Sequence, residues 1–329
     1  MVGRRSVSEL IAANDLDELI REIDRLCEES AWDALMDLRE RCARSHESGR
    51  QMWPAASHAE HRLALEAPGP WAGAVVTEGA AHLGLGPLSE VAASTHTWAE
   101  LWPYLPEGPL VGVVAAERVV RGEMLVDDPR LVTHEIEIPL AVQSWEPTYA
   151  VATYHSWKVE APAPTIAAAA AVTIPGTGFV GIGPGPETAA LADVARSWVT
   201  TSTGTSRAVG VSGGALDAIA ALGATGATAA PVVASDALAL IAWAAASGGA
   251  VGRRRGAAAG RATAWWTAAV LCGLDDDWPP EPAELGNAIA ELEWWVWSPA
   301  GPSVGWACRI AVADPVDGLA WALDAVDHA

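Results

Sequence analysis

Residues 292–312 read LEWWVWSPAGPSVGWACRIAV, and this stretch decides the fold class. Large apolar side chains alternate with other residues on both sides of the Pro- and Gly-containing segment 298–303. The alternating positions are Leu292, Trp294 and Val296 before the segment and Trp306, Cys308, Ile310 and Val312 after it. A period of two residues is typical of half-buried strands, and the short interruption is typical of a turn. The stretch therefore predicts a β-hairpin.

The sequence on either side of this hairpin predicts helices. After it, Asp314 and Pro315 are typical of an N-cap and a first helical position, which predicts a closing helix over 315–327. Before it, helices are expected over about 187–200, from 215, and over about 235–247, 257–273 and 282–292, with a strand at 207–212. Runs of helices that end in a hairpin favour a mostly helical α+β fold over a doubly wound parallel sheet.

A change of composition predicts the domain organisation. Residues 161–187 are dominated by Pro, Gly and Ala, which indicates an interdomain linker. We therefore expect a helical region over 1–160 and an α+β domain over 188–329. Within the first region, apolar and polar residues alternate over 131–142, which predicts a small β element near 131–159, with 149–159 as its candidate partner.

The first 67 residues carry the spacing of amphipathic helices. Ser6 and Glu9 form a capping-box pattern, and the apolar positions Leu19, Ile23 and Leu26 recur at helical spacing. Helices joined by short connections pack as antiparallel neighbours. This region is therefore expected to be solenoid-like or bundle-like.

Charge restricts the classes of partner. The chain of 329 residues has a formal net charge of −21, and 51% of its residues are hydrophobic. The hydrophobic fraction argues against a disordered chain. The negative charge repels phosphate backbones and anionic lipid, which argues against nucleic acid and membrane surfaces as partners. Another protein is the expected partner, with a small anionic ligand as the alternative.

Cysteine usage and hydropathy predict a cytoplasmic protein. The four cysteines, Cys27, Cys42, Cys272 and Cys308, lie far apart and form no CxxC pair. Such scattering is typical of reduced thiols rather than of a disulfide framework or a zinc site. Acidic residues interrupt the first twenty positions where a signal peptide needs an apolar core, and no run is apolar enough to span a membrane.

The segment 248–261 is the sharpest candidate for a binding site. Glycines there alternate with cations directly before a predicted helix, and such loops bind anions through backbone N–H groups and guanidinium groups. The candidate ligand-binding residues are Gly249, Gly252, Arg253, Arg254, Arg255 and Arg261. Alternatively, the arginines pair with the chain's own carboxylates, such as those of Asp275, Asp276 and Asp277. No Lys-Ser or Lys-Thr follows the glycines, so the segment is not a Walker A loop.

The predicted hairpin carries a second candidate surface. Trp295 and Trp297 share one face with Glu293 and Arg309 if the strands pair as expected. Two indoles beside an arginine can stack a ligand or anchor a protein interface. Alternatively, a helix covers this face, the indoles are core residues, and Glu293 pairs with Arg309 across the strands.

Signals for metal, cofactor or catalytic chemistry are weak. His58 and His61 lie at a spacing that can chelate a metal, but the pattern favours a surface helix with incidental histidines, so no metal site is predicted. No dinucleotide loop, nucleophile elbow or paired catalytic carboxylates stand out, so no cofactor and no catalytic residues are assigned.

Several segments together carry a resemblance. They are Trp53-Pro-Ala-Ala, Ala93-Ser-Thr-His-Thr-Trp98, Gly248 to Trp266, Glu291-Leu-Glu-Trp-Trp, Gly305-Trp-Ala-Cys-Arg and Leu319-Ala-Trp-Ala. In these segments the chain resembles an uncharacterised actinobacterial family with no assigned function. The resemblance implies a bacterial cytoplasmic setting and one architecture over most of the chain, and it implies no activity.

Two functional hypotheses follow from the sequence. The first is a non-catalytic interaction or adaptor protein with an acidic surface. The second is a small-anion-binding protein or enzyme that uses residues 248–261 to hold a phosphate, nucleotide or carboxylate.

Overall fold

The computed structural model describes residues 5–77, 84–132, 137–166, 170–174, 179–224, 226–301 and 305–328. The chain divides into two compact units. Residues 1–135 and 152–160 form the helical unit, and residues 136–151 and 161–329 form the sheet unit. The fold is α+β and mostly helical, as the sequence predicts.

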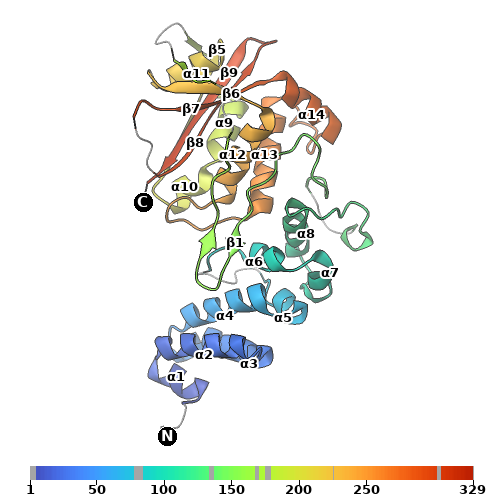
Figure 1. Ribbon diagram of the computed structural model, residues 1–329, viewed down its shortest axis with the longest axis vertical. Coiled ribbons are helices and arrows are strands. Elements are labelled where there is room, and N and C mark those ends of the chain that lie inside the picture. Colours follow the sequence, from blue (N-terminus) through green and yellow to red (C-terminus); the bar gives the residue numbers. More distant parts are fainter. Residues whose placement is uncertain are drawn as a thin grey trace. The chain divides into compact units, whose positions relative to one another are not determined.

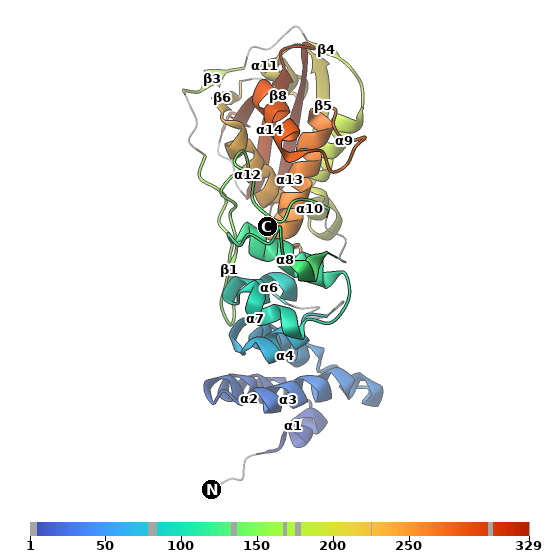
Figure 2. The same cartoon turned by 90° about the vertical axis from the view of Figure 1, so that its right-hand side faces the viewer.

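The helical unit is a stack of short helices. They are α1 (Val7–Ala13), α2 (Leu16–Glu28), α3 (Trp32–Arg44), α4 (Trp53–Glu66), α5 (Gly69–Ala74), α6 (Leu88–Thr95), α7 (Trp98–Leu101) and α8 (Leu110–Val120), with the 3-10 helices η1 (Ser45–Ser48), η2 (Trp102–Tyr104) and η3 (Pro129–Leu131). The predicted capping box of Ser6 and Glu9 starts α1, and α2 buries Leu19 and Ile23 completely. Within this unit, Figure 2 shows the pair α2 and α3, then α4, then α6 to α8 in successive layers.

The small β element is a local hairpin and not the predicted pairing. β1 (Thr153–Tyr154) pairs antiparallel with β2 (Val159–Glu160). Of the strand predicted over 131–142, residues 133–136 lie outside the described residues, and 137–142 form no strand. Pro139 has no N–H to donate to a ladder, and its carbonyl accepts a hydrogen bond from a side chain of the sheet unit instead.

The core of the sheet unit is a seven-stranded antiparallel sheet. Its strands are β3 (Val172–Thr173), β4 (Val180–Gly181), β5 (Thr205–Ser212), β6 (Thr228–Val232), β7 (Glu293–Ser298), β8 (Trp306–Asp314) and β9 (Leu319–Asp327), in the order β3-β6-β7-β8-β9-β5-β4. β7 and β8 form the hairpin that the alternating residues predict, with Trp294 opposite Val312 and Val296 opposite Ile310.

The prediction of a closing helix over 315–327 is wrong, because β9 occupies most of this segment. β9 pairs with β8 on one side and with β5 on the other. The carboxylate of Asp314 accepts hydrogen bonds from the backbone N–H groups of Val316 and Asp317, at 2.8 and 3.1 Å, and Gly318 adopts a φ of +65°. Asp314 therefore stabilises a hairpin turn rather than the first turn of a helix.

The Pro-, Gly- and Ala-rich segment 161–187 lies within the sheet unit and supplies both edges of the sheet. β3 pairs with β6, and β4 pairs with β5. Each of these strands is only two residues long, which is why no alternating pattern marks them in the sequence. The segment predicted as a linker is therefore part of the folded unit.

Helices cover both faces of the sheet. They are α9 (Pro186–Asp193), α10 (Arg196–Thr201), α11 (Ala215–Ala221), α12 (Ala234–Ala246), α13 (Ala257–Leu271) and α14 (Pro282–Glu291). Figure 1 shows α11 on one side of the sheet and α9, α12 and α13 on the other. α12 and α13 approach closely, since a Cβ on Gly260 would lie 2.3 Å from the carbonyl oxygen of Ala242. Among the described residues, no helix has the length and apolarity needed to cross a membrane.

Candidate functional site

The glycine-rich half of the segment 248–261 is a closed loop that holds an internal anion. The N–H of Ala250 donates to Oδ2 of Asp327 at 2.6 Å, and the N–H of Val251 donates to Oγ of Ser202 at 3.2 Å. Asp327 is fully buried at the end of β9. In this loop one backbone N–H, that of Ala250, thus binds a carboxylate of the same chain.

The electrostatics of Asp327 follow from these contacts. Burial alone would raise the pKa of this carboxyl, but hydrogen bonds from the Ala250 N–H and the hydroxyls of Ser202 and Thr203 hold the pKa below its ordinary value. Gly249 has a φ of +76°, and a Cβ at this position would lie 2.1 Å from Oδ2 of Asp327. Gly249 thus makes room for the internal carboxylate.

Arg261 is also committed to internal contacts. Its guanidinium is buried and forms two hydrogen bonds of 2.7 Å with the carboxylate of Glu146, and it donates to the carbonyls of Pro139 and Ala141 at 2.8 and 2.9 Å. Burial would raise the pKa of Glu146, but the hydrogen bonds and the charge of Arg261 lower it below its ordinary value. The internal pairing considered for this arginine therefore occurs with Glu146 and not with Asp275, Asp276 or Asp277.

The other members of the predicted cluster differ in exposure. A Cβ on Gly252 would lie 2.1 Å from the carbonyl oxygen of Gly248, so this glycine allows a close approach of two backbone segments. Arg253 and Arg255 are exposed, and Arg254 is half-buried. Of the four arginines, Arg255 alone lines one of the cavities described below.

The tryptophan face of the hairpin is packed. Trp297 is only 5% exposed, and its Nε1 donates to the carbonyl of Leu323 at 3.1 Å. α11 covers this face, and Trp295 packs against the same apolar cluster. The guanidinium of Arg309 lies 5.4 Å from the ring centre of Trp297 and pairs with Asp324 on β9 at 2.8 Å. The cross-strand partner of Arg309 is thus Asp324 rather than Glu293, which is exposed.

The two histidines of α4 face the β1–β2 hairpin. The ring of His58 stacks on Trp157 with centroids 3.9 Å apart, and Nε2 of His61 lies 2.8 Å from the carbonyl oxygen of His155. Burial lowers the pKa of His58 to about 4 and also lowers the pKa of His61. No group of three potential metal ligands occurs in the part of the chain that the structure describes.

A groove on the exposed side of α13 combines charged and aromatic side chains. We call it the α13 groove, and its volume is about 490 Å³. It is lined by Glu137, Asp193, Arg196, Arg255, Ala259, Ala262, Thr263, Trp266 and Trp278. The residues come from α13, from the end of α9 and the start of α10, and from three connecting segments.

Helical spacing explains the floor of the groove. Ala259, Ala262, Thr263 and Trp266 form one stripe of α13, and the opposite side of the helix packs against α12. Trp266 is 39% exposed, whereas its neighbour Trp265 is 1% exposed. Small side chains therefore leave an open channel along the helix, and an indole closes one end.

Aromatic and charged groups form the walls. Trp266 and Trp278 meet edge to face, with centroids 5.2 Å apart and ring planes at 78°. Arg196 pairs with Asp193, and this ion pair raises the pKa of Arg196. Arg255 lies directly before the first turn of α13. The groove is thus lined by two indoles, by the guanidinium of Arg255, by the carboxylate of Glu137 and by the Arg196–Asp193 ion pair.

Sequence reasoning found only one of these lining residues. The groove contains neither Trp295 nor Trp297, so the two predicted sites do not share this cavity. Trp266 is not among the predicted site residues, although its place in the stripe with Ala259 and Ala262 puts it on an exposed helix face. Nothing in the sequence links Trp278, Arg196 or Glu137 to that face.

Comparison with known protein families assigns most of the chain to one family. The model of a family of unknown function, DUF6183, matches residues 17–329. The chain belongs to this family. No curated protein and no solved structure matches the chain. Membership in DUF6183 confirms the resemblance to a family without assigned function, and the actinobacterial origin stays a prediction.

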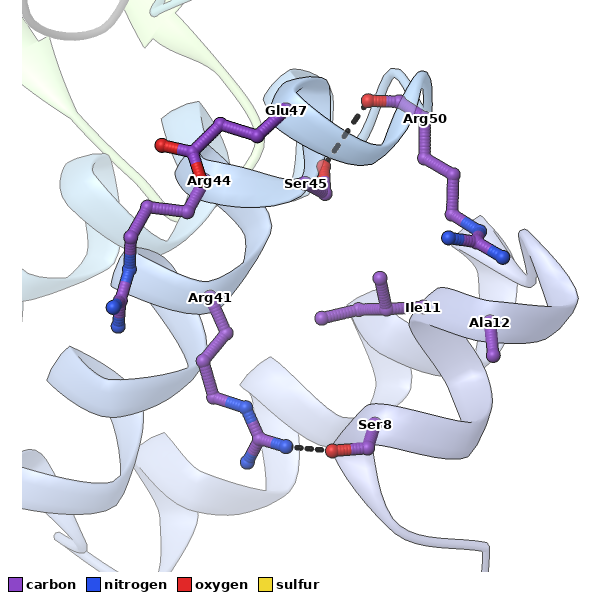
Figure 3. A pocket seen from close by; sticks show the side chains of 8 residues that line it. All are labelled: Ser8, Ile11, Ala12, Arg41, Arg44, Ser45, Glu47 and Arg50. Carbon is purple, nitrogen blue, oxygen red and sulfur yellow. Dashed lines mark hydrogen bonds between the residues drawn. The ribbon is translucent and has the colours of Figure 1, made fainter.

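This DUF6183 member has a second charged cavity in its helical unit. Its volume is about 510 Å³, and it is lined by Ser8, Ile11, Ala12, Arg41, Arg44, Ser45, Glu47 and Arg50. Figure 3 shows Arg41 turned towards Ser8, to which it donates a hydrogen bond, while Arg44 and Arg50 diverge. Arg41 and Arg44 also pair with Asp37 and Glu40, one turn earlier on α3. None of the described residues that line this cavity is aromatic, which distinguishes them from the lining of the α13 groove.

Proposed function

We propose that this protein binds a small organic anion with an aromatic ring in the α13 groove, and that nucleoside monophosphates are the first class to test. One observation carries the proposal: two indoles and two guanidinium groups line one open groove above a floor of small side chains. Small-molecule sites usually have volumes of about 300–1,000 Å³, and the α13 groove falls within this range.

Each wall of the groove matches one part of such a ligand. A planar ring can stack on Trp266 or Trp278, and a base on an aromatic side chain contributes about 1–3 kcal/mol. A phosphate or carboxylate can accept paired hydrogen bonds from Arg255. The carboxylates of Glu137 and Asp193 can accept hydrogen bonds from hydroxyl or amino groups of the same ligand.

The net charge of the chain favours a single nucleotide over a polymer. A charge of −21 repels every phosphate of a nucleic acid, whereas a monophosphate brings only one such group to the local cation. The proposal therefore agrees with the expectation that nucleic acid is not a partner.

Thermal unfolding tests the proposal. Nucleoside monophosphates, benzoate and inorganic phosphate are added separately, and we expect a monophosphate to raise Tm by a few degrees at saturation, because a ligand of the native state stabilises it. Arg255→Gln and Trp266→Ala should each abolish the shift while leaving the circular dichroism spectrum unchanged. Arg253→Gln is the matched control, because this arginine belongs to the same sequence cluster but not to the groove. The proposal fails if no probe shifts Tm, or if the control loses the response as Arg255→Gln does.

A second candidate function is the interaction role predicted for the acidic surface. Its support is a set of exposed carboxylates on α2, at the C-cap of α2 and on α3, those of Asp17, Glu28, Glu29, Asp33, Asp37 and Glu40. Three of them, Glu29, Asp37 and Glu40, also pair with arginines of the same helices. We infer that these two helices present an acidic face to a partner protein. Affinity capture with the intact chain and with an Asp33→Asn, Glu29→Gln variant tests this role. A specific partner should be lost from the variant and at high salt, and a partner that both chains retain equally would argue against the acidic face.

A further inference from the structure

The outer edge of the sheet at β4 has the features of a pairing strand. β4 is the last strand in the order of the sheet, and β5 is its neighbour on the inner side. Within the described residues, no strand pairs with its outer side. We call residues 179–183 the β4 edge. Strands with an open outer side present unpaired backbone groups that can template pairing with another chain.

The hydrogen-bonding pattern between β4 and β5 determines which backbone groups of β4 point away from the sheet. Val180 lies opposite Ser212, Gly181 lies opposite Val211, and the N–H of Ile182 donates to the carbonyl of Gly210 at 3.1 Å. In an antiparallel ladder, alternate residues bond to the same neighbour. Ile182 and Val180 therefore bond inwards to β5, and the N–H and C=O of Gly181 point outwards.

The side chains of the β4 edge are apolar and exposed. The exposed fractions are 41% for Phe179, 67% for Val180 and 43% for Ile182. Soluble proteins usually protect edge strands with charges, particularly lysine, or with inward-pointing polar groups. Residues 161–186 contain no charged residue, although the whole chain carries −21. This edge thus lacks the charges that prevent edge-to-edge pairing.

We propose that the β4 edge is a homodimerisation surface, at which two copies of this chain pair β4 to β4 in antiparallel register. A two-fold axis through Gly181 makes the two strands self-complementary. The N–H of Gly181 then donates to the carbonyl of the partner's Gly181, and the reciprocal bond forms by symmetry. Val180 lies opposite the partner's Ile182, and Phe179 lies opposite the partner's Gly183.

A cavity beside the edge accommodates this register. It has a volume of about 360 Å³ and is lined mainly by apolar groups, including Phe179, Gly181, Gly183 and Pro184. Because Gly183 has no side chain, the ring of the partner's Phe179 can lie over it and cover this cavity. The left-handed φ of +82° at Gly183 ends the extended segment, so pairing is confined to the β4 edge.

Charge explains why the occupant is a second copy. Two chains of −21 repel each other over most approaches, and the repulsion is weakest where both contribute an uncharged surface. The β4 edge lies in the uncharged stretch of both copies. An extended peptide from another protein could pair with the same backbone groups. Only a second copy of this chain, however, places a Phe179 opposite Gly183 and a Gly183 opposite Phe179 at the same time.

Gly181 provides the decisive substitution. A Cβ at this position would meet no atom within 4 Å, and the φ of Gly181 is not in the left-handed region. Gly181→Pro removes the outward N–H and leaves the inward bonds of Ile182 in place. Gly181→Ala keeps the N–H and is the matched control. Val180→Lys adds a charge at the edge and serves as a second variant if the proline disturbs the fold.

Sedimentation velocity over a wide range of protein concentration measures the result. The unmodified chain and Gly181→Ala should dimerise with similar affinity, whereas Gly181→Pro and Val180→Lys should weaken the dimer at least about tenfold. Added salt should not dissociate the dimer, because screening reduces the repulsion between like-charged copies. A monomer at all concentrations, a dimer that both edge variants retain, or dissociation by salt would each overturn the proposal.

Discussion

Arg261 and Arg255 lie near one another at the start of α13, but they differ in burial and in hydrogen bonding. The guanidinium of Arg261 is buried and satisfied by Glu146 and two carbonyls, while that of Arg255 is exposed at the mouth of the α13 groove. On the buried side of α13, groups of the same chain, the carboxylate of Glu146 and two backbone carbonyls, accept the hydrogen bonds of Arg261. On the exposed side, Arg196 pairs with Asp193, and within the described residues no carboxylate is buried against Arg255.

The same contrast occurs within the preceding loop. The backbone donors of Ala250 and Val251 are taken by Asp327 and Ser202, so this part of the loop has no opening for an external anion. In an acidic chain, carboxylates of the chain itself can readily accept the hydrogen bonds that an anion-binding sequence pattern offers. A cationic cluster in the sequence therefore identifies a functional site only where the fold keeps internal carboxylates away from it.

Removal of the buried guanidinium should give the largest effect. Arg261→Met leaves the charge of Glu146 buried without its main partner, and such changes cost about 3–5 kcal/mol of the free energy of unfolding. Arg255→Gln should change it by less than about 0.5 kcal/mol, because this side chain is exposed. Urea unfolding followed by tryptophan fluorescence measures both values.

A double variant separates lost charge from lost packing. In Arg261→Met with Glu146→Gln, the buried charge is also removed, and part of the stability should return. Equal destabilisation by Arg261→Met and Arg255→Gln would contradict the division of α13 into a buried and an exposed side.

The half-buried His58 of the helical unit should give the next largest effect. Burial, together with the charge of Arg62, lowers the pKa of His58 to about 4, below the ordinary value of about 6.5. The unfolded chain then binds more protons than the folded one between these values, so stability falls as the pH drops through this window, by about 2–3 kcal/mol. Glu146 and Asp327 have lowered pKa values, so their contribution is present above the ordinary carboxyl pKa and is lost as the pH falls from there through the lowered values.

Unfolding of the His58→Gln variant isolates this contribution. Its free energy of unfolding should vary less between about pH 7 and pH 4.5 than that of the unmodified chain. The remaining slope includes the contribution of His61, whose pKa burial also lowers. A variant with the same pH dependence as the unmodified chain would show that His58 is protonated equally in both states.

The parts of the fold that the sequence predicts are those with regular periodicity. In the β7–β8 hairpin an apolar residue recurs at every second position, and the capping box of Ser6 and Glu9 marks the start of α1. β9 escaped prediction because it is a central strand with neighbours on both sides. Its run Leu-Ala-Trp-Ala-Leu is apolar throughout, and after an Asp-Pro pair such a run is also typical of a helix.

The candidate site was predictable only in part, because its residues come from distant segments. Arg255 is visible within an unusual cationic run. The alanines of the floor carry no chemical signal, and Trp278 and Arg196 approach α13 only through tertiary packing. Glu146 lies far from Arg261 in the sequence, so no local pattern could identify it as the partner of that arginine.

The smallest effect concerns the glycines of the closed loop. Gly249 and Gly223 both have a left-handed φ, +76° and +84°, but a Cβ on Gly249 would lie 2.1 Å from Oδ2 of Asp327, whereas a Cβ on Gly223 would meet nothing within 4 Å. Gly223→Ala should therefore cost only the backbone strain, about 1 kcal/mol. Gly249→Ala adds displacement of the buried carboxylate from the Ala250 N–H, and the total should reach about 2–3 kcal/mol in urea unfolding. Equal losses of stability for Gly249→Ala and Gly223→Ala would mean that the loop can move away from Asp327 at no cost. The contact with the Asp327 carboxylate would then not be what stabilises the loop.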